Sequence, residues 1–327
     1  MPPLLEVRRL SVAFHTREGA VRAVSDVELE LAAGETLAVV GESGSGKSQM
    51  LLSMLGLLAR NGRAEGSVRL DGEELLGAPE ARLAELRGAA VGYVFQDPMT
   101  SLNPYLSIGT QLTEPVRLHK GADRATAYRR AIEMLKAVHI PESERRMHQY
   151  PHELSGGMRQ RVAIAMALVC SPAILIADEP TTALDVTVQA QVLALLREIK
   201  DQFGTAVILV THDLGVIAEL ADRVHVMYAG RIVERGSVED IFYRYRHPYT
   251  AALKRSVPSW TESRPQRLVA ISGNPPNPLR LPPGCAFAPR CAFRLEVCGE
   301  RLPVLERVTD GHAKACFYAG PLGEEEG

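Results

Sequence analysis

The chain lacks a long hydrophobic run, a strong net charge of either sign and a recognisable secretory signal. No apolar run of roughly 18 residues occurs in its 327 residues, so the sequence predicts no membrane-spanning helix. The net charge is -2 at pH 7, which argues against a general nucleic-acid-binding surface. Residues Met1 to Glu6 lack the basic and apolar regions of a signal peptide, so we expect the protein to stay in the cytoplasm.

Apolar residues make up 46% of the sequence, enough for a sizeable core divided into two or more compact units. Short apolar segments alternate with helical ones, which predicts an α/β fold with a largely parallel sheet covered by helices. The expected core strands are Glu35–Val40, Ala90–Phe95, Ala173–Asp178, Ala206–Val210 and Val224–Tyr228, and the expected core helices are Lys47–Leu58 and Val186–Lys200.

Two further patterns flank or interrupt this core. Leu5 to Phe14 and Val21 to Leu31 alternate apolar and polar residues, which predicts an antiparallel edge layer before the first core strand. From Ser107 to about Lys136 the apolar residues instead follow a helical period. We therefore expect a helical segment inserted into the α/β core.

A glycine-rich run follows the first core strand. Its sequence, Gly41-Glu42-Ser43-Gly44-Ser45-Gly46-Lys47-Ser48, fits the phosphate-binding loop pattern between a strand and a helix. In such a loop the glycines let backbone N–H groups wrap the phosphates, the lysine reaches the β- and γ-phosphates and the serine hydroxyl binds magnesium. The run therefore predicts a nucleoside triphosphate site.

Another apolar strand ends in two carboxylates, Asp178 and Glu179. A buried parallel strand can direct the Asp178 carboxylate at the water shell of the metal, with Glu179 one residue further on, where the γ-phosphate would be. Between this strand and the glycine-rich run lies Leu154-Ser155-Gly156-Gly157-Met158, which alone could be a helix start with Ser155 as N-cap. The loop and the carboxylates together predict ATP hydrolysis.

With these motifs in this order, residues 4 to 255 resemble the nucleotide-binding subunit of ATP-binding cassette (ABC) transporters. The resemblance implies a P-loop NTPase core with an antiparallel β edge subdomain and an inserted helical subdomain, with ATP and magnesium as ligands. Leu154–Met158 looks like the family signature, whose Ser155, Gly156 and Gly157 would bind the γ-phosphate held by the opposite subunit. The other matches are the Q-loop Gln96, the D-loop Asp185, the switch histidine His212 and the adenine-stacking aromatic Phe14.

Phosphoryl transfer to water depends on positioning and on cancelling negative charge at the phosphate oxygens. We expect Lys47 and the amides of Ser43 to Ser48 to supply that cancellation. Glu179 is the candidate that polarises the attacking water, and His212 is the candidate that holds the γ-phosphate and this water in line. The expected magnesium ligands, directly or through water, are Ser48, Gln96 and Asp178.

One chain carries one phosphate loop and one signature, and in the family these face each other only across a head-to-tail pair of domains. The resemblance therefore implies a dimer with an identical or homologous ATP-binding subunit. It also implies two membrane permease subunits and an extracytoplasmic solute-binding protein that acts through them. The chain would then lie peripherally on the cytoplasmic face of the cell membrane. None of its residues would recognise the solute.

Two segments narrow the type of transporter. Gln96-Asp97-Pro98-Met99-Thr100-Ser101-Leu102-Asn103-Pro104 resembles the Q-loop extension of di- and oligopeptide and nickel importers, and Arg246-His247-Pro248-Tyr249-Thr250 resembles the start of their C-terminal extension. The resemblance implies import of di- or oligopeptides, with nickel, an opine or another solute as the alternative. A third class, soluble cassette ATPases acting on DNA or ribosomes, is disfavoured by the single cassette and the lack of a long heptad insert.

Four of the five cysteines cluster in the tail. Cys285, Cys291, Cys298 and Cys316 leave 5, 6 and 17 residues between successive thiols, while Cys170 sits apart in an apolar helix end. In the cytoplasm such a cluster favours a metal over disulfides. Zinc sites usually contain a closer pair, four thiolates also suit an iron–sulfur cluster, and unligated thiols in a small core are the third possibility.

The peptide-importer resemblance extends into this tail through Pro283-Gly284-Cys285, Pro289-Arg290-Cys291 and Cys316, and it favours a 4Fe–4S cluster. We therefore expect an ABC ATPase domain at residues 1–255, with its core at 1–96 and 164–255 and the helical insert at about 97–163. A small C-terminal extension at 256–327 would carry the cysteines.

Overall fold

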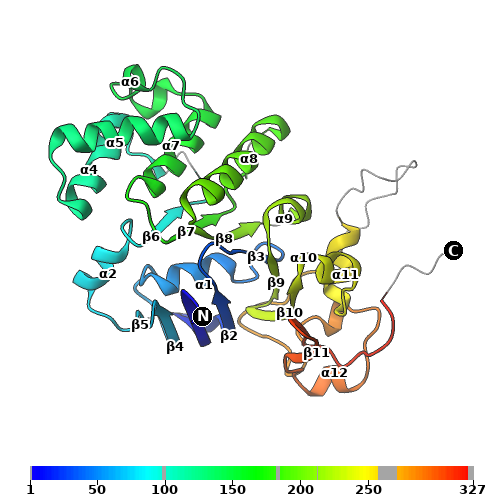
Figure 1. The fold of residues 1–327 in the computed structure, drawn as a ribbon. Coiled ribbons are helices and arrows are strands. Elements are labelled where there is room, and N and C mark those ends of the chain that lie inside the picture. The colour runs from blue at the N-terminus through cyan, green and yellow to red at the C-terminus, as the bar shows by residue number, and fades with distance from the viewer. Residues whose placement is uncertain (1, 98–100, 182–184, 212, 257–270, 323–327) are drawn as a thin grey trace, which may run out of the picture. The chain divides into compact units, whose positions relative to one another are not determined.

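The computed structural model describes residues 2–97, 101–181, 185–211, 213–256 and 271–322 (Figure 1). The chain falls into two compact units, each built from several chain segments. Unit 1 comprises residues 1–3, 31–36 and 77–210, and unit 2 comprises residues 4–30, 37–76 and 211–327. Within the described ranges, no helix has both the length and the apolar character needed to cross a membrane.

Unit 2 contains an antiparallel sheet in the strand order β2-β1-β4-β5. Strand β1 (Leu5–Thr16) pairs with β4 (Gly62–Leu70), and the register runs from Leu5 opposite Leu70 to Phe14 opposite Gly62. Strands β2 (Gly19–Leu31) and β5 (Glu73–Glu74) complete the sheet. Because alternate side chains along β1 and β2 are buried, the period of two in the sequence predicted this edge layer correctly.

A second sheet in unit 2 has the strand order β11-β12-β10-β9-β3. Strand β3 (Thr36–Val40) runs parallel to β9 (Arg223–Tyr228), and β9 pairs antiparallel with β10 (Arg231–Ser237). The C-terminal extension adds a hairpin to this sheet, because β12 (His312–Lys314) pairs with β10 and with β11 (Glu306–Thr309). The sequence did not predict this hairpin.

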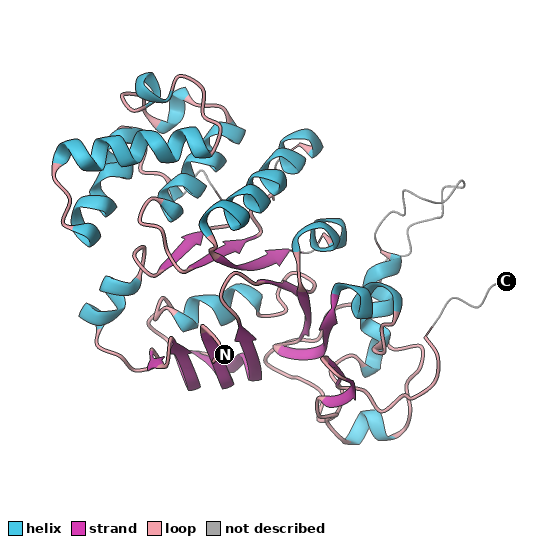
Figure 2. Cartoon of the chain, in the orientation of Figure 1, coloured by secondary structure: helices cyan, strands magenta, loops and turns pink. Residues whose placement is uncertain are grey.

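Short helices cover the second sheet of unit 2 (Figure 2). Side chains of α9 (Leu214–Leu220), α10 (Val238–Tyr243) and α11 (Pro248–Arg255) join those of β3 and β9 in one buried cluster. Phe287 of the C-terminal extension also belongs to this cluster and is only 3% exposed. The extension, which also includes α12 (Val297–Glu300), therefore shares a core with the cassette.

Helix α1 (Lys47–Met54) also lies in unit 2, and it is shorter than expected. The sequence predicted a helix to Leu58, but the helix ends where Gly56 takes a positive φ of 65°. The N–H groups of Gly56 and Leu57 donate to the carbonyls of Ser53 and Leu52, the pattern of a glycine C-cap. The apolar residues beyond Gly56 therefore lie outside the helix.

Unit 1 contains three parallel strands in the order β8-β7-β6. Strand β7 (Ile174–Asp178) lies between β6 (Val91–Val94) and β8 (Ala206–Thr211), and all five of its residues are buried. A parallel strand covered on both faces needs such a continuous apolar run, which the sequence shows. Helix α8 (Val186–Phe203) leads from β7 towards β8.

Most of the other helices of unit 1 form the expected helical region between β6 and β7, drawn in green in Figure 1. Ser107 and Asp123 cap α4 (Ile108–Lys120) and α5 (Arg124–Ala137) by accepting an N–H from the first turn. Helix α7 (Gly156–Leu168) packs against both of these helices. The other short elements of this region are α6 (Ser143–Arg146) and the 3-10 turn η1 (Pro151–Glu153), whereas α2 (Glu80–Leu86) lies before β6.

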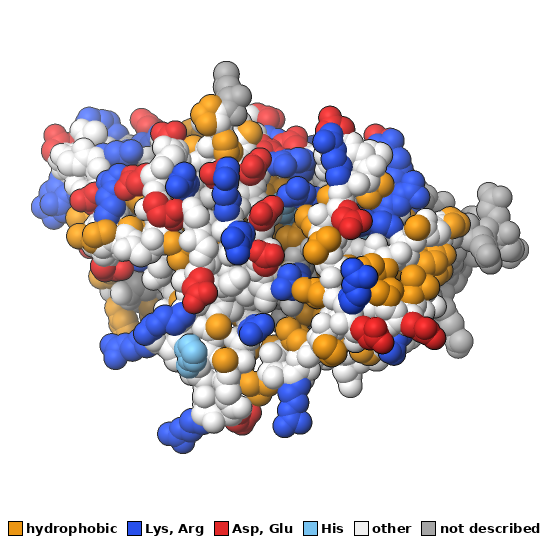
Figure 3. Space-filling model, turned by 90° about the horizontal axis from the view of Figure 1, so that it is seen from below, with side chains coloured by type: hydrophobic (Ala, Val, Ile, Leu, Met, Phe, Trp, Pro, Cys, Tyr) orange, Lys and Arg blue, Asp and Glu red, His pale blue; other side chains and the backbone are white. Residues whose placement is uncertain are grey.

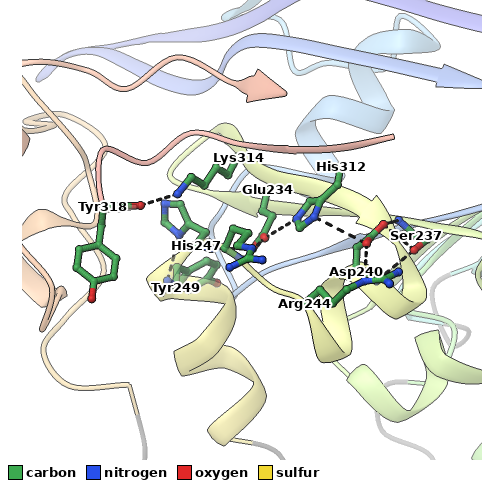
Figure 4. Close-up of polar contacts among 10 residues, drawn as sticks. Glu234, Ser237, Asp240, Arg244, His247, Tyr249, His312, Lys314 and Tyr318 are labelled. Atoms are coloured by element: carbon green, nitrogen blue, oxygen red, sulfur yellow. Dashed lines mark hydrogen bonds and ion pairs between the residues drawn. The ribbon is translucent and has the colours of Figure 1, made fainter. Parts of the chain in front are cut away.

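A buried polar network joins the C-terminal hairpin to the cassette sheet within unit 2 (Figure 4). His312 of β12 donates from Nε2 to Glu234 Oε1 of β10 at 2.9 Å, and its Nδ1 lies 3.8 Å from Asp240 Oδ1. Glu234 is 0% exposed and also accepts the backbone N–H groups of Arg246 and His247. Because Glu234 is a buried carboxylate, each of these donors offsets its loss of hydration.

Replacing His312 with alanine should destabilise the protein, because the buried Glu234 carboxylate would lose its only described side-chain donor. The expected fall in the free energy of unfolding is about 3 kcal/mol, measured by urea denaturation. The matched control is Arg307→Ala on the same hairpin, whose side chain is 72% exposed. This control should change the stability by about 0.5 kcal/mol or less. Equal effects of the two substitutions would contradict the assignment.

Candidate functional site

The glycine-rich run forms a loop in unit 2 between β3 and α1. It approaches neighbouring backbone closely, since a Cβ added to Gly41 would lie 2.1 Å from the carbonyl oxygen of Met227. The N–H of Gly230 donates to the carbonyl of Ser45 at 2.8 Å, which ties the loop to the β9–β10 turn. Ser43 and Gly44 at the crest are exposed. The loop is therefore fixed at its base and open at its crest, as a phosphate-binding loop requires.

Lys47 places its ammonium inside this loop. Its Nζ donates to the carbonyl oxygens of Gly41 at 2.7 Å and Glu42 at 3.0 Å, and the residue is only 5% exposed. Ser48, the expected magnesium ligand, follows in the first turn of α1 and is half-buried. A buried cation beside a crest of backbone amides suits a polyanionic ligand.

The predicted magnesium ligand Asp178 and the predicted catalytic residue Glu179 lie in unit 1, at the end of β7 and directly after it. Tyr93 of β6 donates its hydroxyl to Asp178 Oδ2 at 2.9 Å, and Asp178 is 4% exposed. Burial, together with the neighbouring Asp178 charge, raises the pKa of Tyr93 well above its ordinary value, so the phenol stays a neutral donor. Sequence reasoning missed Tyr93. The sequence signal that could have found it is a tyrosine, with its polar hydroxyl, inside the short apolar strand that pairs with β7.

Glu179 begins the turn after β7 and meets the predicted Q-loop glutamine. Gln96 donates from Nε2 to Glu179 Oε2 at 3.0 Å, and the N–H of Glu179 donates to the carbonyl of Val210 at 2.8 Å. Glu179 has a φ of 47°, a left-handed conformation that costs energy for a residue with a side chain. The contacts with Gln96 and Val210 therefore hold the side chain and the backbone of Glu179 in this strained turn.

The signature residues begin α7 in unit 1. Ser155 is the N-cap and accepts the N–H of Met158 at 3.3 Å, so the alternative reading as a helix start also describes its local role. A Cβ added to Gly157 would lie 2.9 Å from Val188 Cγ1, and Asp185 caps α8 by accepting the N–H of Val188. The structure thus brings the signature close to the predicted D-loop aspartate.

Gln160 connects α7 to the turn after the catalytic strand. Its Nε2 donates to the carbonyl of Pro180 at 2.7 Å, and the side chain is 1% exposed. Sequence reasoning gave this residue no role. Because Pro180 follows Glu179 directly, Gln160 fixes the position of the turn that presents the carboxylate.

The structure does not test the roles predicted for two other site residues, Phe14 and His212. Phe14 is half-buried near the end of β1, where its ring packs beside Gly62, so the proposed adenine contact stays a prediction. His212 lies outside the described residues, as do Pro98 to Thr100 of the Q-loop extension and Ala183 and Leu184 beside Asp185.

The tail cysteines gather in unit 2 around one small cavity. Cys285, Cys291, Cys298 and Cys316 line it with His247 and Phe287, and all five cysteines of the chain are free thiols. Burial raises the pKa of Cys285 and Cys316 and raises that of Cys291 to about 11. Neighbouring cysteines raise the same three values further. These thiols are therefore neutral near pH 7.

This geometry does not support the expected 4Fe–4S cluster. Across the part of the chain that the structure describes, no three His, Cys, Asp or Glu side chains are arranged to hold a metal ion. The physical reason is space, because the cavity measures about 10 Å³, roughly the room for one water molecule. The spacing of the thiols in the sequence could not reveal how tightly they pack.

Comparisons with known proteins agree with these features. The ABC transporter family matches residues 24–182, and the oligopeptide/dipeptide transporter C-terminal region matches residues 233–298. The chain is 54% identical to the oligopeptide transport ATP-binding protein OppD of Haemophilus influenzae over 98% of each chain. It is also 54% identical to OppD of Salmonella typhimurium, over 96% of this chain and 93% of the relative.

A solved structure of similar fold is the dimeric post-hydrolysis state of the ATP-binding cassette MJ0796 bound to ADP and Pi. It is 30% identical, with a TM-score of 0.65 over 72% of this chain and 98% of that one. The chain therefore shares the fold of a known ATP-binding cassette. The chain is a member of the ABC transporter family, an ATP-hydrolysing subunit with the C-terminal region of oligopeptide/dipeptide transporters.

Proposed function

We propose that this chain hydrolyses ATP to drive import of di- or oligopeptides through partner membrane permeases. The observation that carries the proposal is 54% identity to the oligopeptide transport protein OppD along almost the whole chain, C-terminal region included. The proposal divides the chain into an ABC ATPase domain at residues 1–255 and a C-terminal extension at 256–327. Nickel or another solute is the alternative cargo for the same machine.

The chemistry follows from the residues of the phosphate loop and the catalytic strand. Lys47 and the loop amides would neutralise the triphosphate, and Ser48, Gln96 and Asp178 would hold Mg²⁺ directly or through water. Glu179 would polarise the attacking water, assisted by His212. The contacts that support these roles are the Tyr93–Asp178 and Gln96–Glu179 hydrogen bonds, because each holds a carboxylate in one orientation.

Hydrolysis would require a second ATP-binding subunit. Ser155, Gly156 and Gly157, with Asp185 nearby, would contact the ATP held by the partner's loop, so that ATP joins the two subunits. Closure on ATP and parting after hydrolysis is a two-state change that can drive a transporter. Support comes from the exposed Ser155 and Gly156, which leave the start of α7 accessible to such a ligand.

The subunit would act on the cytoplasmic face of the membrane, with two permeases and an extracytoplasmic solute-binding protein. A role on nucleic acid is disfavoured by the charge distribution. On the face drawn in Figure 3, basic and acidic side chains are interspersed, whereas a nucleic-acid surface gathers basic ones. The net charge of -2 agrees.

Peptide import should be reproduced in proteoliposomes that contain the permeases and the solute-binding protein. We expect ATP-dependent accumulation of a labelled tripeptide and none of labelled nickel. Lys47→Ala should abolish this accumulation, because the loop would lose its buried cation. Accumulation of nickel without peptide would instead show that this ATPase drives the import of nickel, the alternative cargo.

Glu179→Gln should lower kcat for ATP hydrolysis by about 100-fold or more and leave ATP binding intact. The glutamine keeps the shape of the side chain but cannot polarise the attacking water. Steady-state phosphate release measures the first effect and calorimetric titration with MgATP the second. The matched control is Glu198→Gln on α8, an exposed carboxylate that should leave both unchanged. Near-normal turnover in Glu179→Gln would remove Glu179 from this role.

We also propose that the four tail thiols can take up a 4Fe–4S cluster, although their described arrangement is closed. The support is the convergence of Cys285, Cys291, Cys298 and Cys316 on one cavity. Uptake would require the four side chains to move apart and to lose their protons. Such a cluster would be a local cross-link of the extension, and no step of ATP hydrolysis depends on it.

Anaerobic purification tests this directly. We expect iron and sulfide to copurify in equal amounts with a brown protein, and Cys291→Ser to lose both. Cys170→Ser is the control, because that buried thiol lies in unit 1. A colourless protein with zinc would assign the site to zinc, and one without metal would leave a core of unligated thiols.

A further inference from the structure

The phosphate loop carries an acidic side chain of its own. Glu42 follows Gly41 directly, and its side chain is 25% exposed. An unpaired carboxylate at this position would repel the triphosphate that the loop has to bind. Neither the loop pattern nor the catalytic strand accounts for how this charge is compensated.

Arg290 of the C-terminal extension meets this carboxylate. It ends the 3-10 turn η2 (Ala288–Arg290), and its Nη1 and Nη2 donate to the two oxygens of Glu42 at 2.6 and 3.0 Å. This is the bidentate geometry in which arginine binds a carboxylate most strongly. Both partners belong to unit 2.

The guanidinium has little freedom to move. Its remaining donors reach the carbonyl of Ser272 at 2.9 Å, the carbonyl of Ile271 at 3.1 Å and the hydroxyl of Tyr228 at 3.2 Å. The side chain is 4% exposed and lies 6.0 Å from the centre of the Phe287 ring. The hydrogen bond to Glu42 raises the pKa of Arg290 further, so the guanidinium stays charged.

A second residue holds the backbone at the same position. The hydroxyl of Tyr249 on α11 accepts the N–H of Glu42 at 2.8 Å, and Tyr249 is 0% exposed. Its ring centre lies 4.5 Å from that of Tyr228 and 5.4 Å from that of Phe287. The side chain and the backbone of Glu42 are thus both fixed by residues that come more than 200 positions later in the sequence.

We propose that Arg290 is a positioning residue for the phosphate loop: it neutralises Glu42 and, together with Tyr249, sets the affinity of the loop for ATP. The C-terminal extension therefore contributes to nucleotide binding as well as to the packing of unit 2. This inference rests on the proposed role of Gly41–Ser48 as the phosphate-binding loop.

A double-mutant cycle on Arg290 and Glu42, made in the whole chain, tests this proposal. The measured quantity is the Kd for MgATP, obtained by calorimetry. Arg290→Ala should weaken ATP binding about tenfold, because Glu42 would be left uncompensated. Glu42→Gln should bind ATP at least as tightly as the unmodified chain. The double variant Arg290→Ala/Glu42→Gln should recover to within about twofold of it. The control is Arg294→Ala, an exposed arginine of the same extension, with no change expected.

A merely structural role gives a different pattern. If Arg290 served only to pack the extension, the double variant would bind ATP as weakly as Arg290→Ala, and this outcome would overturn the proposal. Unchanged affinity in Arg290→Ala would do the same. Should Arg290→Ala fail to fold, Tyr249→Phe keeps the ring and removes only the acceptor for the Glu42 N–H. It should weaken ATP binding about threefold, and an unchanged Kd would then count against the proposal.

Lys47→Ala separates this proposal from the function on which it rests. If ATP binding survives that substitution, the phosphate-loop assignment itself is wrong, whatever Arg290 does. If Lys47→Ala abolishes binding and the double-mutant cycle shows no coupling, only the role of Arg290 is lost.

Discussion

The close approach of the phosphate loop to strand β9 is the constraint on which the nucleotide-binding part of unit 2 depends. Gly41 has no room for a Cβ beside the carbonyl of Met227, and the turn at Gly230 is hydrogen-bonded to Ser45. The loop therefore takes its position from β9, a strand that comes far later in the chain. Whatever fixes β9 and its partner β10 also fixes the backbone of the glycine-rich loop.

An equivalent constraint acts in unit 1, where β7 is fully buried between two parallel neighbours. Its end brings Asp178 to Tyr93, and the turn that follows brings Glu179 to Gln96. The left-handed backbone at Glu179 is costly. It is held by the hydrogen bond to Val210 and by Gln160, which binds the next carbonyl. The orientation of both carboxylates is thus set by neighbouring segments rather than by the motif alone.

The sequence could predict what is local. Strand periods, the glycine-rich loop and the run ending in Asp178 each depend on residues close together in the chain, so their positions follow from the order of residues alone. It could not predict the contacts that join distant segments, such as Arg290 with Glu42 or His312 with Glu234. The tail illustrates the limit, because four thiols suggested a metal cluster while their packing leaves room for about one water. Gly56 is a local signal for the end of α1, and the predicted helix to Leu58 overlooked it.

The C-terminal extension and the loop depend on each other through one aromatic residue. Phe287 lines the thiol cavity on one side and packs against Tyr228 and Tyr249 on the other, while Arg290, three residues later, reaches Glu42. The extension contributes few large apolar residues, so it gains its core by packing on the cassette. In return it places the Arg290 guanidinium against the Glu42 carboxylate of the loop. Because Phe287 and Arg290 are three residues apart, the packing around the thiol cavity and the pairing of Glu42 depend on the same short segment of the extension.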